Sequence, residues 1–427
     1  MSGESVSRPV GRLVVVGAGQ AGVHVVSALR RSGHDGDVTL IGGEDHLPYQ
    51  RPPLSKAFLK EPHSAHIVFH RAEHYDSIGV RLLCGDPARG IDRDHGLVVL
   101  ESGVEVPYDH LVLATGSRPR MLDELSSAGN VFTVHGWNDS CRLHERLGGA
   151  RSMLLIGGGF IGLEVATVAS ELGCEVTVVE QATRVLGHML PPLVADFLAG
   201  RHAESGVKFR FGETIKAFEF GANGDVRSAT TSSGARVDAD VVVVGIGSQP
   251  QVDLAERAGL DTADGITVDE HLTTSDPRIS AAGDCIRFPV GSRSCRLTSV
   301  QHATDSAQYL AKALLGTRPG YDPVPWFWTD QAGVKVQIAG MPGRSADRSE
   351  LIGDVSNGRF AVWRYDGDEF IGGEAVGMPR EHLKMRRELA ETRRSDRMRW
   401  RAGCDTAPGP PAAGDMAGLG VHPPTRD

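Results

Sequence analysis

Two glycine-rich segments of the sequence have residue types and a spacing that suit a diphosphate. Each segment follows a short apolar run and precedes a stretch of helical character. A diphosphate needs backbone N–H donors and close access to the main chain, which glycines at the start of a helix provide. The first glycine allows a tight turn, the second removes a blocking Cβ, and the third lets helix and strand pack closely. We therefore expect dinucleotide contacts from two sets of residues: Gly17, Gly19, Gln20, Ala21 and Gly22, and Gly157, Gly159, Phe160, Ile161 and Gly162.

An acidic residue follows each glycine segment at roughly the 20-residue distance typical of dinucleotide-binding units. Glu44 comes after the apolar run 38–41, and Glu180 comes after the run 176–179. A carboxylate at this position accepts hydrogen bonds from both ribose hydroxyls and repels a 2′-phosphate. Glu180 therefore predicts NAD(H) over NADP(H), although the nearby Arg184 argues the other way. Glycine turns in a doubly wound sheet without any dinucleotide are the alternative, which two complete copies disfavour.

A second pair of similar segments indicates how the chain is organised. Residues 109–119 resemble residues 240–250, in the same order relative to the two glycine segments. After Pro250 the pattern of the first unit returns, with an apolar run before Asp284 and a helical stretch over 299–315. We therefore expect an α/β fold with two Rossmann-like dinucleotide-binding domains, the second inserted in the first.

The last third of the chain has a different pattern. Alternation of apolar and polar residues over 334–338 and 359–364 predicts strands of a smaller α+β domain. The expected boundaries are 10–122 and 249–323 for the first domain, 123–248 for the inserted domain and 324–400 for the C-terminal domain. Residues 401–427, which are rich in proline, glycine and alanine, are expected to form a disordered tail.

Composition excludes several classes of protein. A chain of 427 residues with 40% hydrophobic and 23% charged residues is an ordinary globular protein of more than one domain. A net charge of −9 argues against a nucleic-acid partner, because phosphate binding needs a basic face. The run 13–16 is too short for a signal peptide, and Glu164 and several glycines interrupt the longest apolar segment, 153–169. We therefore expect no membrane span and a cytoplasmic location.

Neither the cysteines nor the histidines indicate a metal site or a redox dithiol. No two cysteines form a CxxC or CxxxxC pair, so they are interpreted as reduced thiols in a reducing compartment. His66, His70 and His74 would align on one helix, but their surroundings predict a strand-like edge followed by a short helix, and we expect no metal there. The six cysteines are Cys84, Cys141, Cys174, Cys285, Cys295 and Cys404.

Together with segments 46–56 and 324–331, these motifs closely resemble those of FAD-dependent ferredoxin reductases of the putidaredoxin reductase type. That group belongs to the pyridine nucleotide–disulfide oxidoreductase superfamily, and the resemblance extends from about Leu13 to Leu389. It implies FAD in the first unit, NAD(H) in the second, and the activity of a ferredoxin–NAD(+) reductase. Electrons would pass from NADH through FAD to a small iron–sulfur protein, such as a [2Fe–2S] ferredoxin serving a P450 or a Rieske oxygenase.

The resemblance also implies roles for single residues. Lys56 and Glu164 would lie together beside the isoalloxazine as the catalytic pair, Asp284 would bond the ribitol, and Arg51 would lie near the FAD pyrophosphate. Without the family, Lys56 would be a surface lysine and Glu164 a solvent-facing glutamate on its helix. Trp328 would pack beside the flavin, or serve as an ordinary core tryptophan. The further cofactor contacts that the resemblance implies are Thr115, Gly116, Val300 and Gly247.

The chain departs from the family pattern just before and inside the helical stretch 299–315. Related sequences tend to read Glu-Ser-Val-Gln-Asn, where this chain has Thr298 and His302 at the two ends. The helix is expected to point its N-terminus at the pyrimidine end of the flavin, so the loss of the glutamate affects that end. His302 is expected to be a structural histidine, with titration near the flavin as the alternative.

The acceptor is narrowed by what the chain lacks. No cysteine precedes Cys84, so the dithiol chemistry of the superfamily is excluded and a protein acceptor remains. The basic segment from Arg380 to Arg401 would steer an acidic ferredoxin, or would simply be a solvated terminal helix. A rubredoxin reductase is a close alternative. A flavin- and NAD(H)-binding regulatory protein with slow turnover is an alternative of another class. The oligomeric state stays open between a monomer and a homodimer.

Overall fold

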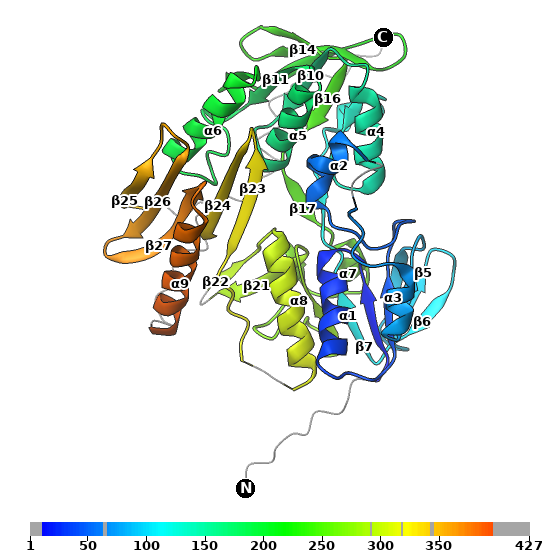
Figure 1. The fold of residues 1–427 in the computed structure, drawn as a ribbon. Helices are drawn as coiled ribbons and strands as arrows, with labels where there is room; N and C mark the ends of the chain where they lie inside the picture. Colours follow the sequence, from blue (N-terminus) through cyan, green and yellow to red (C-terminus); the bar gives the residue numbers. More distant parts are fainter. Residues whose placement is uncertain (1–10, 63–65, 291–292, 317–318, 342–345, 396–427) are drawn as a thin grey trace, which may run out of the picture.

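A computed structural model describes residues 11–62, 66–290, 293–316, 319–341 and 346–395 (Figure 1). Its first sheet is parallel, in the order β20-β7-β1-β2-β3. All four residues of β1 are buried, as expected for a central strand covered on both faces. Helices α1 and α8 lie side by side on this sheet (Figure 1), and Gln20 of α1 donates to Thr304 of α8 at 3.0 Å. The elements are β1 (Leu13–Val16), β2 (Val38–Ile41), β3 (Val80–Leu83), β7 (His110–Leu113), β20 (Ile279–Ala281), α1 (Gln20–Arg31) and α8 (Val300–Leu314).

The second sheet repeats the first. Its five strands are also parallel, in the order β12-β11-β10-β16-β9, and the helix α5 again follows the central strand directly. Every residue of β16 is buried, and so are four of the five residues of β10. The elements are β9 (Val131–Phe132), β10 (Ser152–Ile156), β11 (Glu175–Glu180), β12 (Lys208–Phe211), β16 (Val241–Val244), α4 (Trp137–Leu147), α5 (Phe160–Glu171) and α6 (Pro192–Glu204).

The second unit is inserted in the first. The chain leaves the first sheet after β7 and returns to it in β20, where His110 and Ser280 are bonded across 170 residues of sequence. The outgoing strand β8 (Ser117–Pro119) and the returning strand β17 (Ser248–Pro250) pair with each other in an antiparallel ribbon. The expected α/β fold with two nested Rossmann-like units is therefore confirmed, while the residue numbers of the domain boundaries stay a prediction.

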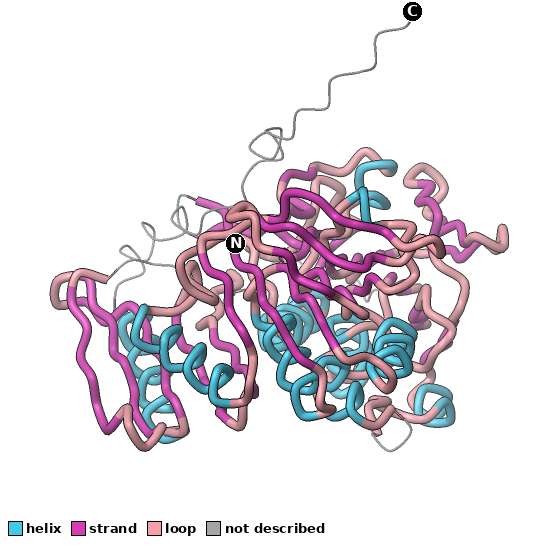
Figure 2. The backbone as a smooth tube through the Cα atoms, turned by 90° about the horizontal axis from the view of Figure 1, so that it is seen from above, coloured by secondary structure: helices cyan, strands magenta, loops and turns pink. Residues whose placement is uncertain are grey.

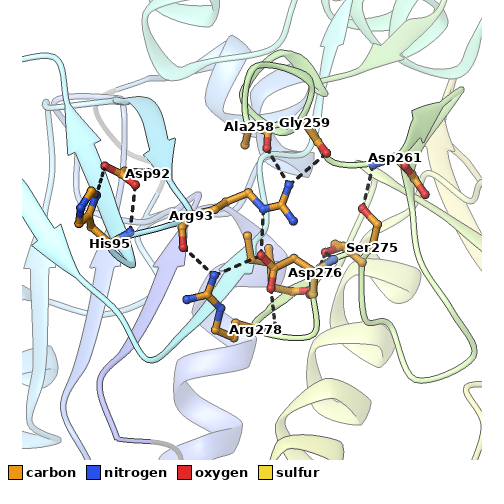
Figure 3. Close-up of polar contacts among 11 residues, drawn as sticks. Asp92, Arg93, His95, Ala258, Gly259, Asp261, Ser275, Asp276 and Arg278 are labelled. Atoms are coloured by element: carbon orange, nitrogen blue, oxygen red, sulfur yellow. Dashed lines mark hydrogen bonds and ion pairs between the residues drawn. The ribbon is translucent and has the colours of Figure 1, made fainter.

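A polar cluster joins the two halves of the first unit on either side of the insertion (Figure 3). The guanidinium of Arg93 contacts the carboxylate of Asp276 at 2.9 Å and donates to the carbonyls of Ala258 and Gly259. Arg278 in turn donates to the carbonyl of Arg93 at 2.6 Å. Arg93 precedes the inserted unit and its partners follow it, so these bonds hold together segments that are distant in sequence.

Smaller elements complete these two units. Two three-stranded antiparallel sheets, β4-β5-β6 and β13-β14-β15, and one mixed sheet, β18-β19-β21-β22, lie outside the parallel sheets. In the described part of the chain, no helix combines the length and apolarity that a membrane crossing needs. The bounds are β4 (Ala88–Asp92), β5 (Leu97–Leu100), β6 (Glu105–Pro107), β13 (Ile215–Phe220), β14 (Val226–Thr231), β15 (Arg236–Asp238), β18 (Thr262–Ala263), β19 (Gly265–Thr267), β21 (Ile286–Val290), β22 (Arg293–Cys295), α2 (Ala57–Lys60), α3 (Ala72–Ser77), α7 (Asp253–Arg257) and the 3-10 turns η1 (Pro52–Ser55) and η2 (Asp123–Leu125).

The C-terminal part is an antiparallel sheet in the order β23-β24-β27-β26-β25, a layer of its own beside the rest of the molecule (Figure 2). One face packs on α9, while apolar residues of the other face cluster with side chains of α6. The strands that the sequence predicts here are confirmed. The expected tail 401–427 lies outside the described residues. The elements are β23 (Trp326–Gln331), β24 (Val334–Gly340), β25 (Arg348–Asp354), β26 (Arg359–Asp366), β27 (Glu369–Val376) and α9 (Pro379–Ser395).

An ion pair is buried inside this sheet. Glu374 of β27 is fully buried, and its carboxylate lies 3.0 Å from the guanidinium of Arg364 on β26. Burial raises the pKa of Glu374 to about 7, because the loss of hydration outweighs the attraction of Arg364. Between about pH 4.5 and pH 7, Glu374 therefore keeps a proton in the folded protein that it has released in the unfolded chain.

This pair makes stability depend on pH. Because the pKa of Glu374 is higher in the folded state, its contribution is fully present below about pH 4.5 and is lost as the pH rises to about 7. We expect Glu374→Gln to remove about 3 kcal/mol of this dependence. Thermal unfolding midpoints between pH 4.5 and 8 measure it, with the exposed Glu350→Gln as control. Identical pH slopes for wild type and Glu374→Gln would contradict the assignment.

Candidate functional site

The first glycine turn has the shape of an anion cradle. Gly17 has a φ of +112°, and a Cβ there would lie 2.1 Å from the carbonyl oxygen of Ala114. A Cβ on Gly22 would lie 1.9 Å from the carbonyl oxygen of Gly17, whereas a Cβ on Gly19 would meet no atom within 4 Å. Neither a capping side chain nor an acidic residue occupies the first turn of α1. The open space beside Gly19 and the backbone N–H groups at the start of α1 fit a diphosphate.

The second turn has the same construction. Gly157 has a φ of +95°, and a Cβ there would lie 2.6 Å from the carbonyl oxygen of Gly245. Helix α5 begins at Phe160, again without a side-chain cap and without an acidic residue in its first turn. Ile161 is exposed, and Phe160 packs edge-on against Phe327 at 5.1 Å. A second dinucleotide therefore fits here on the same physical grounds.

Glu44 lies at the edge of the first turn within a small polar cluster. Its carboxylate accepts hydrogen bonds from Tyr49 at 2.5 Å and from Arg51 at 2.6 Å. Burial acts to raise the pKa of Glu44, but the charge of Arg51 and these hydrogen bonds hold it below its usual value. Arg51 also donates to the carbonyl of His135 at 2.5 Å. An ionised carboxylate and a cation are thus both available near the first turn.

Glu180 closes the second turn. One carboxylate oxygen accepts from the backbone N–H of Gly158 at 2.6 Å, and the other accepts from Ala182 at 2.7 Å. The carboxylate is therefore fixed beside the glycine turn, where a ribose would lie. Arg184, which the sequence left as an argument for a 2′-phosphate, bonds Asp196 at 2.8 Å.

Asp284 lies between the first sheet and the start of α8. Burial raises its pKa to about 6, against the attraction of Arg296 and a hydrogen bond from Ser117. Thr115 donates to the carbonyl of Gln251 at 2.6 Å and precedes Gly116, whose φ is +72°. Gly247, with a φ of +99°, is the corresponding residue of the second unit. Asp284 therefore presents a carboxyl group that can accept from hydroxyl groups.

Lys56 and Glu164 are in contact. The ammonium nitrogen of Lys56 lies 2.6 Å from the carboxylate of Glu164, whose side chain is only 6% exposed. Ser55 donates to the same carboxylate oxygen at 2.6 Å, and Thr329 donates to the other at 2.6 Å. The alternative in which Glu164 faces solvent is therefore wrong. The sequence missed Ser55 and Thr329, although both lie in the segments that carry the family resemblance.

The remaining residues lie around α8 and β23. Val300 is the first residue of α8, whose N-terminus is capped by Ser299. His302 is buried, bonds the hydroxyl of Tyr321 at 3.0 Å and stacks on Phe288. Burial lowers the pKa of His302 to about 4, so this histidine is neutral and structural. Thr298 is exposed and Trp328 is partly buried. The ring of Trp328 lies 5.8 Å from that of Trp326.

The three histidines do not share one helix, because His66 and His70 precede α3 and only His74 lies in it. Val68 forms an isolated bridge with Tyr49, and α3 begins only after His70. His70 and His74 stack at 3.9 Å, and no cluster of three metal-ligand side chains occurs among the described residues. The expected strand-like edge followed by a short helix is confirmed.

Comparison with known proteins gives the chain a clear set of relatives. Residues 11–307 match the pyridine nucleotide-disulphide oxidoreductase family, and residues 326–403 match a reductase C-terminal domain. The chain is 40% identical to rhodocoxin reductase of Rhodococcus erythropolis, over 88% of this chain and 89% of that protein.

Solved structures agree with this relationship. A ferredoxin reductase for the CYP199A2 system of Rhodopseudomonas palustris superposes with a TM-score of 0.83 at 38% identity, covering 87% of this chain and 92% of the other. The reductase in a covalent putidaredoxin reductase–putidaredoxin complex gives a TM-score of 0.84 at 35% identity, covering 89% and 93%.

Gly19 and Gly22 of the first turn allow a matched test. We expect Gly19→Ala to leave the cofactor-free protein as stable as wild type, because its Cβ meets no atom, but to weaken FAD binding about tenfold or more. Gly22→Ala is expected to destabilise the cofactor-free protein by about 1–3 kcal/mol, because its Cβ meets backbone. Thermal unfolding and FAD titration by fluorescence separate the two effects. Unchanged FAD affinity in Gly19→Ala would rule out this turn as the diphosphate site.

Proposed function

The chain belongs to the pyridine nucleotide-disulphide oxidoreductase family, and from that premise we propose that it is an FAD-dependent ferredoxin–NAD(+) reductase. It takes reducing equivalents from NADH and delivers them to a small iron–sulfur protein, a [2Fe–2S] ferredoxin of a P450 or Rieske oxygenase system. We propose a cytoplasmic location, which the lack of any disulfide among the described cysteines supports. We also propose the domain boundaries stated above, at residues 123, 249 and 324.

The ion pair between Lys56 and Glu164 is the observation that carries this proposal. Glu164 lies on α5, directly after the second glycine turn, and Lys56 follows the segment whose Arg51 reaches Glu44 near the first turn. We propose that the groups bound at the two turns meet beside this pair. A cation held by a buried carboxylate stabilises negative charge that develops beside it.

The other residues bind and orient. We propose that the glycine turns and the helix ends behind them hold the diphosphates of FAD and NADH, and that Glu44 and Glu180 accept from the ribose hydroxyls. Asp284 accepts from the ribitol, and Trp328 shields the ring system from water. The further cofactor contacts are Gln20, Ala21, Arg51, Thr115, Gly116, Phe160, Ile161, Gly247 and Val300. When bound, FAD supplies the chemistry that accepts electrons in pairs and releases them singly.

Dithiol chemistry is disfavoured in spite of the family's name. No disulfide joins the described cysteines, and the first of them, Cys84, comes well after the first glycine turn in the sequence. Burial raises the pKa of the Cys84 thiol, assisted by the charge of Asp45, so little thiolate forms at neutral pH. A protein acceptor is therefore the better proposal.

The surface of α9 supports an acidic acceptor. Arg380, Lys384 and Arg387 are exposed on this helix, in a protein with a net charge of −9. Opposite charge steers association and fixes the docking orientation. Arg386 instead lies over the ring of Trp326 at 4.3 Å, next to Trp328. Arg397, Arg399 and Arg401 of the basic segment lie outside the described residues.

A panel of electron acceptors tests the function. The purified protein is expected to show a flavin spectrum and to oxidise NADH rapidly when a [2Fe–2S] ferredoxin is present. Steady-state NADH oxidation is measured with ferredoxins, with rubredoxin and without any acceptor. Faster turnover with rubredoxin would favour the rubredoxin reductase. Slow reduction with a stable charge-transfer complex and a change of oligomeric state would favour a regulatory protein instead.

Glu180 is expected to set the choice of nicotinamide cofactor. Glu180→Ala removes the carboxylate that excludes a 2′-phosphate, so the NADH-to-NADPH ratio of kcat/KM should fall about tenfold or more. The neighbouring Glu213→Ala is the control, because the Glu213 carboxylate bonds Arg210 and Ser233 instead of the glycine turn. A wild type that already prefers NADPH, or an unchanged ratio in Glu180→Ala, would refute the role of Glu180.

A further inference from the structure

Glu164 ends a chain of buried hydrogen bonds that begins on α6. The hydroxyl of Thr329 lies 2.6 Å from one carboxylate oxygen, and the amide nitrogen of Gln331 lies 3.0 Å from that hydroxyl. The amide oxygen of Gln331 lies 2.8 Å from Nε2 of His202. Thr329 and His202 are fully buried and Gln331 is 2% exposed, so water does not compete for these groups.

When the Glu164 carboxylate pairs with Lys56, the donors and acceptors of these hydrogen bonds can be arranged in only one way. A carboxylate that pairs with Lys56 can only accept, so the single hydroxyl hydrogen of Thr329 is donated to it. Thr329 must then accept from the amide nitrogen of Gln331, which turns the amide oxygen towards His202. His202 must therefore carry its proton on Nε2. Burial lowers the pKa of His202, so the ring is neutral and Nδ1 is a bare acceptor, buried without a protein partner.

These hydrogen bonds also join separate parts of the fold. His202 lies on α6 and Glu164 on α5, both of the inserted unit, whereas Thr329 and Gln331 lie on β23 of the C-terminal sheet. In Figure 1, β23 runs alongside α8 at one end and reaches α5 at the other. Lys56 and Ser55 belong to the first unit. Three side chains from two other parts of the fold thus contact the carboxylate of Glu164.

We propose that Thr329, Gln331 and His202 are positioning residues, which hold the Glu164 carboxylate aimed at Lys56. This inference rests on the proposed function for its kinetic consequence, although the arrangement itself does not need a cofactor. Each carboxylate oxygen has its own donors, Ser55 and Lys56 on one and Thr329 on the other. Loss of the Thr329 hydroxyl leaves a buried oxygen without a donor, and the carboxylate turns away from Lys56 to find one.

Thr329→Val is the variant that tests this, with Thr329→Ser as the conservative rescue. Thr167→Val is the matched control, because Thr167 also joins α5 to the C-terminal sheet, accepting from Ala332 in the turn after β23 at 3.0 Å, but does not touch Glu164. Gln331→Met removes the next link and leaves the Thr329 hydroxyl in place. It decides the matter if Thr329→Val does not fold. All variants are made in the full chain.

The first measurement uses the cofactor-free protein. Acylation of Lys56 by an amine-reactive ester is followed by peptide mass spectrometry, with Glu164→Gln as the upper limit. We expect acylation to be about tenfold faster in Thr329→Val, less so in Gln331→Met, and unchanged in Thr329→Ser and Thr167→Val. Equal rates in Thr329→Val and wild type would overturn the proposal. An equal increase in Thr167→Val would overturn it too, by showing a general loosening of the interface.

The second measurement uses the FAD-loaded protein. The limiting rate constant of flavin reduction by NADH is expected to fall about tenfold in Thr329→Val, with the apparent Kd for NADH unchanged and the flavin potential lowered. Thr329→Ser should restore all three values. If the wild type binds no FAD, the proposed function fails while the acylation result still decides the role of Thr329. If the wild type is reduced normally and Thr329→Val matches it, only the present inference fails.

Discussion

A carboxylate buried as deeply as that of Glu164 is stable only when its charge is balanced and both of its oxygens accept hydrogen bonds. The balancing charge is Lys56, from the first unit, and the other donors come from Ser55 and from Thr329 on the C-terminal sheet. No single unit of the fold contains all of these groups. The buried charge of Glu164 is therefore one of the contacts that join these parts of the fold, together with the apolar clusters between them.

The two glycine turns show the same dependence of structure on chemistry at the level of the backbone. At Gly17 and Gly157 a side chain is excluded by the carbonyl of the neighbouring strand, while at Gly19 the protein itself leaves the space open. Gly17 and Gly157 serve the fold, because the two turns could not close otherwise. Gly19 serves no contact within the protein, so its function lies in what the turn binds. Helix α5 begins after a similar glycine turn, again without a side-chain cap and without an acidic residue in its first turn.

Sequence reasoning succeeded where the structure is local. Spacing of glycines, apolar runs and a following acid predicted both turns and the nested order of the sheets, because backbone geometry within a βαβ unit repeats. It failed for Glu164, for which local pattern favoured solvent exposure, because its partner Thr329 lies 165 residues away. It also left Arg184 ambiguous, since only the fold brings Asp196 within 2.8 Å. Contacts between distant segments are not encoded in periodicity, and only the family resemblance suggested the pair with Lys56.

The return of the chain to β20 has a consequence for how the protein is made. β7 pairs with β1 on one side, but its other neighbour, β20, is bonded to it across 170 residues of sequence. At usual rates of translation, roughly 10 to 30 s pass between the two strands. Throughout that interval the β7 edge of the nascent sheet is apolar and has unsatisfied backbone groups, while the inserted unit is still being synthesised. The nascent chain is therefore open to edge-to-edge aggregation until β20 joins the first sheet.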